Sequence, residues 1–156
     1  MKGLVVVLLS VMCVYANPAT TITKSCDESY NEKFCGEDYH CRASRCFYKN
    51  LSSIEEAFRF YINEAIQAYE SSDEPKSQNI YWLVYEYMLN TPLPKVNESS
   101  KYTANLSENA RVCEFEFKHT KDRLIIEFNA CQEEDDSITF IQRPDYIEIL
   151  STTVAM

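Results

Sequence analysis

Two periods of hydrophobic residues divide the chain beyond residue 50. Between 54 and 70, apolar side chains recur at helical spacing opposite a mostly acidic face. From 79 onward the spacing changes to two, which is the period of a strand. The pattern therefore predicts an α+β fold, with one long helix packed on an antiparallel sheet of about four strands.

The predicted helix carries a start signal. Ser52 with Glu55, or Ser53 with Glu56, has the spacing of a capping box, in which the hydroxyl accepts from an early amide and the glutamate reaches back. The apolar stripe is expected to be core, because the opposite face is not rich in lysine and arginine like that of a membrane-surface helix. The stripe consists of Ile54, Phe58, Tyr61, Ile62, Ala65 and Tyr69.

The segment NIYWLVYEYMLN, residues 79–90, is predicted to be a central strand. A period of two places Tyr81, Tyr85 and Tyr87 on one face, and neither face is clearly polar. These tyrosines are candidate anchors for a protein partner, since large rigid aromatics are common at interfaces. The favoured alternative is that they pack under the helix or under the cysteine-rich segment.

Prolines interrupt the strand pattern on both sides of a predicted hairpin. Thr91-Pro92-Leu93-Pro94 cannot continue a strand, and 95–109 predicts a long loop or an irregular edge strand. The acidic run 133–136 is expected to be a solvated loop. Short runs at 138–141 and 146–150, separated by Arg143-Pro144, predict an edge strand with a break.

The hairpin itself is predicted at 111–132. Its apolar face is best buried when Phe115 lies opposite Phe128 and Phe117 opposite Ile126. If Cys113 lay directly opposite Cys131, the strand register would differ by one residue from the register that buries the phenylalanines. A one-residue bulge or a strand end near Ala130 and Cys131 is therefore predicted.

The first sixteen residues predict a secretory signal cleaved after Ala16. An apolar run follows Lys2, and it is shorter than the roughly 20 residues that a membrane-spanning helix needs. The expected organisation is a signal peptide at 1–16, a small four-cysteine module at 17–49 and an α+β domain at 50–156.

Cleavage would leave six of the seven cysteines, so three disulfides are expected in an oxidising compartment. In the four-cysteine module, pairing of Cys26 with Cys41 and of Cys35 with Cys46 is favoured, although four cysteines allow three pairings. Zinc binding is disfavoured, because the intervals differ from the two tight Cys-x-x-Cys pairs of zinc sites. Gly36 is expected to supply a positive φ in a turn.

The formal charge of −9 repels phosphate backbones and anionic membranes, so neither nucleic acid nor a membrane is an expected partner. A basic protein surface is compatible with this charge. Asn-x-Ser sequons at Asn50, Asn97 and Asn105 predict N-glycosylation at loops or element ends, in keeping with secretion.

Two stretches resemble the cystatin and cathelin-like superfamily. AFRFYINEAIQAYESSDEPKSQNIYWLV is similar to the family's helix running into its second strand, and VCEFEFKHTKDRLIIEFNACQ to its final disulfide-closed hairpin. The resemblance covers about half of the chain, residues 50–132, and implies a sheet wrapped around one helix. The family's inhibitory motifs are absent: the matching loops read NTPLPKVNESS and KHTKDR, and the single tryptophan, Trp82, falls in the predicted strand.

The sequence predicts neither catalysis nor a bound cofactor or metal. The two histidines, His40 and His119, look exposed, and the sequence offers no phosphate-cradling glycine loop or nucleophile elbow. The predicted function is that of a secreted binding protein that recognises an extracellular protein. The alternatives are a protease inhibitor that uses Pro92, Leu93, Pro94 and the turn at Thr120, with the prolines pre-organising the loop, or a secreted toxin or effector.

Overall fold

The computed structural model describes residues 21–70, 79–106, 112–129 and 134–155, so the predicted signal peptide lies outside the described residues. The helices are α1 (Tyr30–Cys35), α2 (Ile54–Glu70) and α3 (Ile80–Asn90). The strands are β1 (Thr23–Cys26), β2 (Cys41–Lys49), β3 (Glu98–Ala104), β4 (Cys113–His119), β5 (Arg123–Phe128), β6 (Glu134–Gln142) and β7 (Ile147–Ala155).

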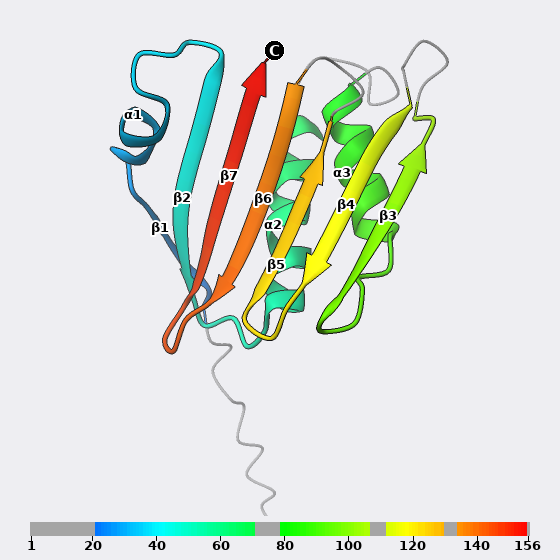
Figure 1. Ribbon diagram of the computed structural model, residues 1–156. Coiled ribbons are helices and arrows are strands. Elements are labelled where there is room, and N and C mark those ends of the chain that lie inside the picture. Colours follow the sequence, from blue (N-terminus) through cyan, green and yellow to red (C-terminus); the bar gives the residue numbers. More distant parts are fainter. Residues whose placement is uncertain (1–20, 71–78, 107–111, 130–133, 156) are drawn as a thin grey trace, which may run out of the picture.

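All seven strands form one antiparallel sheet in the order β1-β2-β7-β6-β5-β4-β3. Helices α2 and α3 lie across one face of this sheet, behind the strands in the view of Figure 1, and α1 lies at the β1–β2 edge. The predicted fold, one long helix on about four strands, is therefore wrong. The sequence pattern missed the strands of the cysteine-rich segment, and it placed the strand runs at the end of the chain at an edge of the sheet instead of in its interior.

Helix α2 has the predicted start. The Ser53 hydroxyl accepts a hydrogen bond from the Glu56 amide at 3.1 Å. The Glu56 carboxylate reaches back one residue further than a capping box does, and accepts from the Ser52 amide at 2.7 Å. This bond and the one from the Ser52 hydroxyl, the larger cause, lower the pKa of Glu56. The buried residues of α2 are Ile54, Ala57, Phe58 and Ile62.

The segment 79–90 is helix α3 and not the predicted central strand. The side chain of Asn79 caps it by accepting a hydrogen bond from the Trp82 amide at 3.1 Å. Val84 and Met88, four residues apart, are buried. The only charged side chain of the run is the exposed Glu86. Its apolar residues contact both α2 and the sheet, so they do not form one narrow stripe that reveals a helical period.

The strands bury the face that the hairpin pattern predicts. Phe115 lies opposite Phe128 and Phe117 opposite Ile126, which confirms the predicted register. Both phenylalanines of β4 are almost inaccessible to solvent, and so is Phe140 of β6. The core therefore fills the space between this face of the sheet and the two longer helices.

Strands β6 and β7 lie in the interior of the sheet, so the predicted broken edge strand is wrong. Pro144 belongs to the turn between them, which the Arg143 amide closes by donating to the Tyr146 carbonyl at 2.9 Å. Of the acidic run predicted to be a solvated loop, Glu133 lies outside the described residues, while Glu134 to Asp136 open β6, where Asp136 is buried.

The cysteine-rich segment is joined to the same sheet, because β2 pairs with β7 from Cys41 to Tyr48. Disulfides link Cys26 to Cys46 and Cys35 to Cys41. The favoured pairing of Cys26 with Cys41 and of Cys35 with Cys46 is therefore wrong. Strand pairing explains the difference, because β1 places Cys26 directly opposite Cys46.

Helix α1 continues along the edge of β2 where the short strand β1 stops. The Asn31 side chain accepts a hydrogen bond from the Ala43 amide of β2 at 2.7 Å, so an edge amide is satisfied. Gly36 ends α1 with φ +61°, which confirms the predicted positive φ. The edge of the sheet formed by β1 and β2 is thus partly covered.

The predicted bridge of the hairpin is described in part. Cys113 is disulfide-bonded, but Cys131 and Ala130 lie outside the described residues. Strand β5 ends at Phe128, and beyond it the Glu114 amide donates to the side-chain oxygen of Asn129 instead of a backbone carbonyl. The regular ladder therefore stops next to the position where the sequence predicts a bulge or a strand end.

Replacing the cap of α3 tests its assignment as a helix. Asn79→Ala is expected to lower the free energy of unfolding by about 1 kcal/mol, while Asn79→Asp, another good cap, retains most of the stability. Asn90→Ala, at the exposed other end of α3, is the control and should change stability by less than about 0.5 kcal/mol. Chemical denaturation measures all three, and equal losses in Asn79→Ala and Asn90→Ala would contradict the cap.

Candidate functional site

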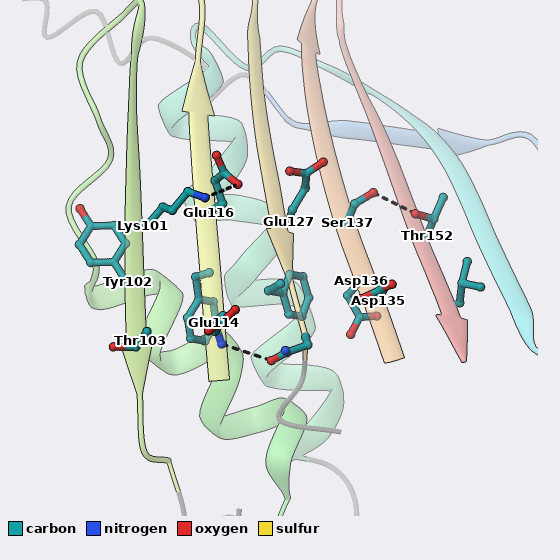
Figure 2. Close-up of a pocket in the computed structure, with 14 residues that line it drawn as sticks. Lys101, Tyr102, Thr103, Glu114, Glu116, Glu127, Asp135, Asp136, Ser137 and Thr152 are labelled. Atoms are coloured by element: carbon teal, nitrogen blue, oxygen red, sulfur yellow. Dashed lines mark hydrogen bonds and ion pairs between the residues drawn. The ribbon is translucent and has the colours of Figure 1, made fainter. Parts of the chain in front are cut away.

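The face of the sheet that points away from α2 and α3 is here called the open face. Figure 2 shows side chains that stand on this face over five neighbouring strands, with the helices on the far side. They alternate along each strand with the residues that fill the core. Because the strands are paired, the position of each side chain is set by the register of the sheet.

One row of side chains crosses the open face in register. Its members lie opposite one another in successive strand pairs, and they are Lys101, Glu116, Glu127, Ser137 and Thr152. Lys101 pairs with Glu116 at 3.4 Å, and the hydroxyls of Ser137 and Thr152 share a hydrogen bond of 2.9 Å. The row thus runs from charged groups on β3–β5 to hydroxyls on β6 and β7 (Figure 2).

Glu116 and Glu127 stand directly opposite each other, a like-charge arrangement that is unfavourable in a sheet. Lys118 offsets it, with its ammonium group 2.7 Å from the Glu127 carboxylate and 3.5 Å from that of Glu116. The hydrogen bond to Glu127 is the main cause of the raised pKa of Lys118. The row is therefore tied together by two lysines.

A hollow of about 650 Å³ lies along this row, and it is called the acidic hollow below. Five carboxylates line it against a single ammonium group, that of Lys101. The five are Glu114, Glu116, Glu127, Asp135 and the buried Asp136. Glu114 and Asp135 form no ion pair with any other described residue, so the hollow has a negative charge that its own lysine does not balance.

A second group of side chains lies on the open face at its β2–β7 side and is called the aromatic–arginine cluster. Its members are Tyr30, Arg45, Phe47, Arg143, Tyr146 and Glu148. The guanidinium of Arg45 lies 5.1 Å from the ring centre of Phe47 and 6.0 Å from that of Tyr30. The Phe47 ring in turn meets the Tyr146 ring edge to face.

Glu148 holds the two arginines of this cluster together. It is 3% exposed and accepts hydrogen bonds from Arg45 at 2.7 Å and from Arg143 at 2.7 and 2.9 Å. Burial alone raises the pKa of Glu148, but the bonds from Arg143 and Arg45 together outweigh burial and hold it below its ordinary value. The carboxylate is therefore ionised and fixes both guanidinium groups on the surface.

The three tyrosines proposed as anchors lie on α3 and pack inward. Tyr81 and Tyr85 both stack on Tyr69 of α2, and Tyr87 packs on Phe115 at 4.9 Å between ring centres. The Tyr81 hydroxyl donates to Glu134 of β6, and burial raises its pKa. The alternative reading, in which these tyrosines pack in the interior, is therefore the one the geometry supports.

The two loops predicted to be inhibitory, 91–94 and the turn at Thr120, lie at one end of the sheet, and 91–94 is bonded to the neighbouring strands. Pro94 lies beside the hairpin turn, with its carbonyl oxygen 2.9 Å from Nδ1 of His119. The Tyr102 hydroxyl donates to the Pro92 carbonyl at 3.1 Å, while Leu93 packs against the core. Pro94 and Thr91 are buried, so Pro92 is the most exposed residue of this stretch.

The three sequons lie where the sequence predicts. Asn50 follows β2, Asn97 precedes β3 and Asn105 follows β3, and all three side chains are exposed. Asn50 and Asn97 have positive φ values of 67° and 69°, which asparagine tolerates in turns.

The open face was not predicted as a site. In the sequence, Glu114, Glu116 and Lys118 alternate with the buried residues of β4, which indicates an exposed face of the hairpin but not a binding site. Within the described ranges, no group of three or more His, Cys, Asp or Glu side chains is arranged to hold a metal ion. No helix of the described part has the length and apolar character to cross a bilayer.

Comparison of the chain with protein-family models, curated proteins and solved structures gave no match. The resemblance to the cystatin and cathelin-like superfamily therefore stays a prediction. The sheet around one helix that it implied is replaced by the seven-stranded sheet covered by α2 and α3 that is described above.

Neutralising Glu148 tests the aromatic–arginine cluster. Glu148→Gln leaves two guanidinium groups without their buried counter-charge and should lower the free energy of unfolding at pH 7 by about 3 kcal/mol. Because the folded pKa lies below the ordinary 4.5, the stabilisation is full above 4.5 and is lost as the pH falls through the folded value.

The difference between the wild type and Glu148→Gln in denaturant titrations should therefore shrink below pH 4.5. Glu37→Gln, which changes an exposed carboxylate, is the control and should leave stability nearly unchanged. A difference that stays constant down to the lowest pH would show that the charge of Glu148 does not contribute.

Proposed function

We propose that this protein is a secreted, disulfide-stabilised and non-catalytic binding protein that recognises an extracellular protein through the open face of its sheet. One observation carries the proposal. The described helices α2 and α3 cover one face of the sheet, while the other presents the acidic hollow beside the aromatic–arginine cluster.

The open face has the rigidity that recognition favours. Its side chains stand on paired strands and are held by cross-strand contacts such as Lys101–Glu116 and Ser137–Thr152. Side chains that are already ordered lose little entropy when a partner binds. A surface of this kind can therefore bind without the ordering cost of a mobile loop.

The composition of the aromatic–arginine cluster is that of an interface centre. Arginine and tyrosine are over-represented among the residues that carry most of the binding energy in protein complexes. Phe47 and Tyr146 are half-buried, so each keeps ring surface for a partner. Arg45 and Arg143 are each paired with Glu148, which leaves their remaining N–H groups as donors.

The acidic hollow indicates the charge of the partner. Its unbalanced carboxylates add to a chain with a formal charge of −9, so a protein that presents lysine or arginine is attracted over a long distance. Such attraction raises the association rate more than the final affinity and weakens as salt is added.

Secretion is supported by the sequence and by the bonding of cysteine. Two disulfides join described cysteines, and Cys113 is in a third, as expected for a chain that folds in an oxidising compartment. The geometry lends less support to a protease inhibitor, because Thr91 and Pro94 are buried and only Pro92 of the 91–94 stretch is exposed to a protease. A toxin or effector would be a binding protein that uses the same face.

A charge-matched pair of variants tests the proposal. Glu114→Gln/Glu127→Gln/Asp135→Asn removes three charges from the acidic hollow, and Glu28→Gln/Glu55→Gln/Glu86→Gln removes three exposed charges elsewhere. Both are compared with the wild type against an array of purified extracellular proteins that range from acidic to basic. Surface plasmon resonance at low and high salt gives the rate and equilibrium constants.

The wild type should select basic proteins, and the hollow variant should bind at least about tenfold more weakly, mainly through slower association. The control variant should retain affinity within about threefold. Equal losses in both variants would mean that only net charge matters. Absence of binding to any basic protein, or no loss in the hollow variant, would contradict recognition through the hollow.

A further inference from the structure

Strand β3 is the exposed edge of the sheet. It pairs with β4 on one side, and the strand order ends with it. The opposite edge is partly covered, because β1 has only four residues and α1 lies along the rest of β2. The seven residues of β3 therefore offer the longer row of backbone groups to a further strand.

An edge of this kind is a template for pairing with a second copy of the chain. The sequence of β3, ESSKYTA, contains no proline, and Lys101 is its one lysine. The Lys101 side chain already leans toward Glu116 of β4. The strand's own residues thus give it little of the protection that proline and lysine give to edge strands.

Two sequons bracket this edge. Asn97 directly precedes β3 and Asn105 directly follows it, so the two asparagines are separated by about 26 Å at 3.3 Å per residue. Both side chains are exposed. A sugar chain on each would rise from the two ends of the longer edge strand.

The spacing of the two sequons would place glycans where they obstruct antiparallel pairing of β3 with β3 of a second copy. If β3 paired with β3 of a second copy about a two-fold axis at Lys101, Asn97 of each copy would lie opposite Asn105 of the other. The two lysines at the axis would also face each other, which is unfavourable. Glycans at both asparagines would therefore meet at both ends of such a dimer.

We infer that Asn97 and Asn105 carry N-linked glycans whose role is to keep β3 from pairing with a second copy of the chain. The inference rests on the secretion contained in the proposed function, because N-glycans are added on the secretory route. It does not depend on what binds the open face. Asn50 lies at the other side of the sheet, at the end of β2, so a glycan there cannot shield β3.

The full chain is produced in a secreting eukaryotic cell line, and glycopeptide mass spectrometry measures occupancy at each asparagine. Light scattering after size exclusion then gives the molar mass over a range of concentrations. The wild type should be occupied at Asn97 and Asn105 and monomeric. Asn97→Gln/Asn105→Gln should rise toward the mass of a dimer as concentration increases, while Asn50→Gln stays a monomer.

A third variant tests whether the association takes place through strand β3. Thr103→Lys, added to Asn97→Gln/Asn105→Gln, places a second lysine on β3 opposite Glu114 of β4, so it is compatible with the sheet. It should restore the monomer. Native trimming of the wild-type glycans with an endoglycosidase, which leaves a single sugar on each asparagine and adds no charge, should reproduce the association without any substitution at β3.

Three results would overturn the inference: secreted protein that is unmodified at Asn97 and Asn105, an Asn97→Gln/Asn105→Gln variant that stays monomeric, or a dimer that Thr103→Lys does not dissociate. Failure of the chain to be secreted would instead count against the proposed function. Unchanged partner binding in the hollow variant would also count against the proposed function, and with unchanged occupancy and mass it would leave this inference intact.

Discussion

The fold depends on one constraint: each strand of the sheet buries one of its two faces. Because side chains alternate along a strand, a register that brings Phe115 opposite Phe128 beneath the helices also brings Glu116 opposite Glu127 on the other face. Slippage by one residue would exchange the two faces entirely. Core packing against α2 and α3 therefore fixes the open face as firmly as it fixes the interior.

This coupling explains why an unfavourable charge pair persists on the surface. Phenylalanine burial is worth several kcal/mol per side chain, whereas exposed like charges cost a fraction of one. The core therefore decides the register, and Lys118 compensates at the surface by reaching both carboxylates. Core burial also sets the register of the cysteine-rich segment, because Tyr48 of β2 and Ile147 of β7 lie opposite each other and are both buried.

How far the sequence predicts this structure depends on where the deciding contacts lie. Helix α2 and the register of the β4–β5 hairpin follow from local patterns, and both are confirmed. Helix α3 was missed because its apolar residues contact both α2 and the sheet and leave Glu86 as its only charged residue, although Asn79 at its start is a cap signal. The row of side chains along the acidic hollow could not be predicted from the sequence. Its members, such as Lys101, Glu127 and Thr152, are far apart in the chain and are brought into one row only by the strand order. The pairing of Cys26 with Cys46 likewise needs β1 beside β2.

The most direct test of the one-sided sheet is residue-resolved carbodiimide labelling of carboxyl groups in the native protein. The structure predicts rapid labelling of Glu114, Glu127 and Asp135 on the open face. It predicts slow labelling of Asp136 and Glu148, which are 5% and 3% exposed. If Glu114, Glu127 and Asp135 were protected as well as Asp136, the face would be covered, and the proposed mode of binding would be contradicted.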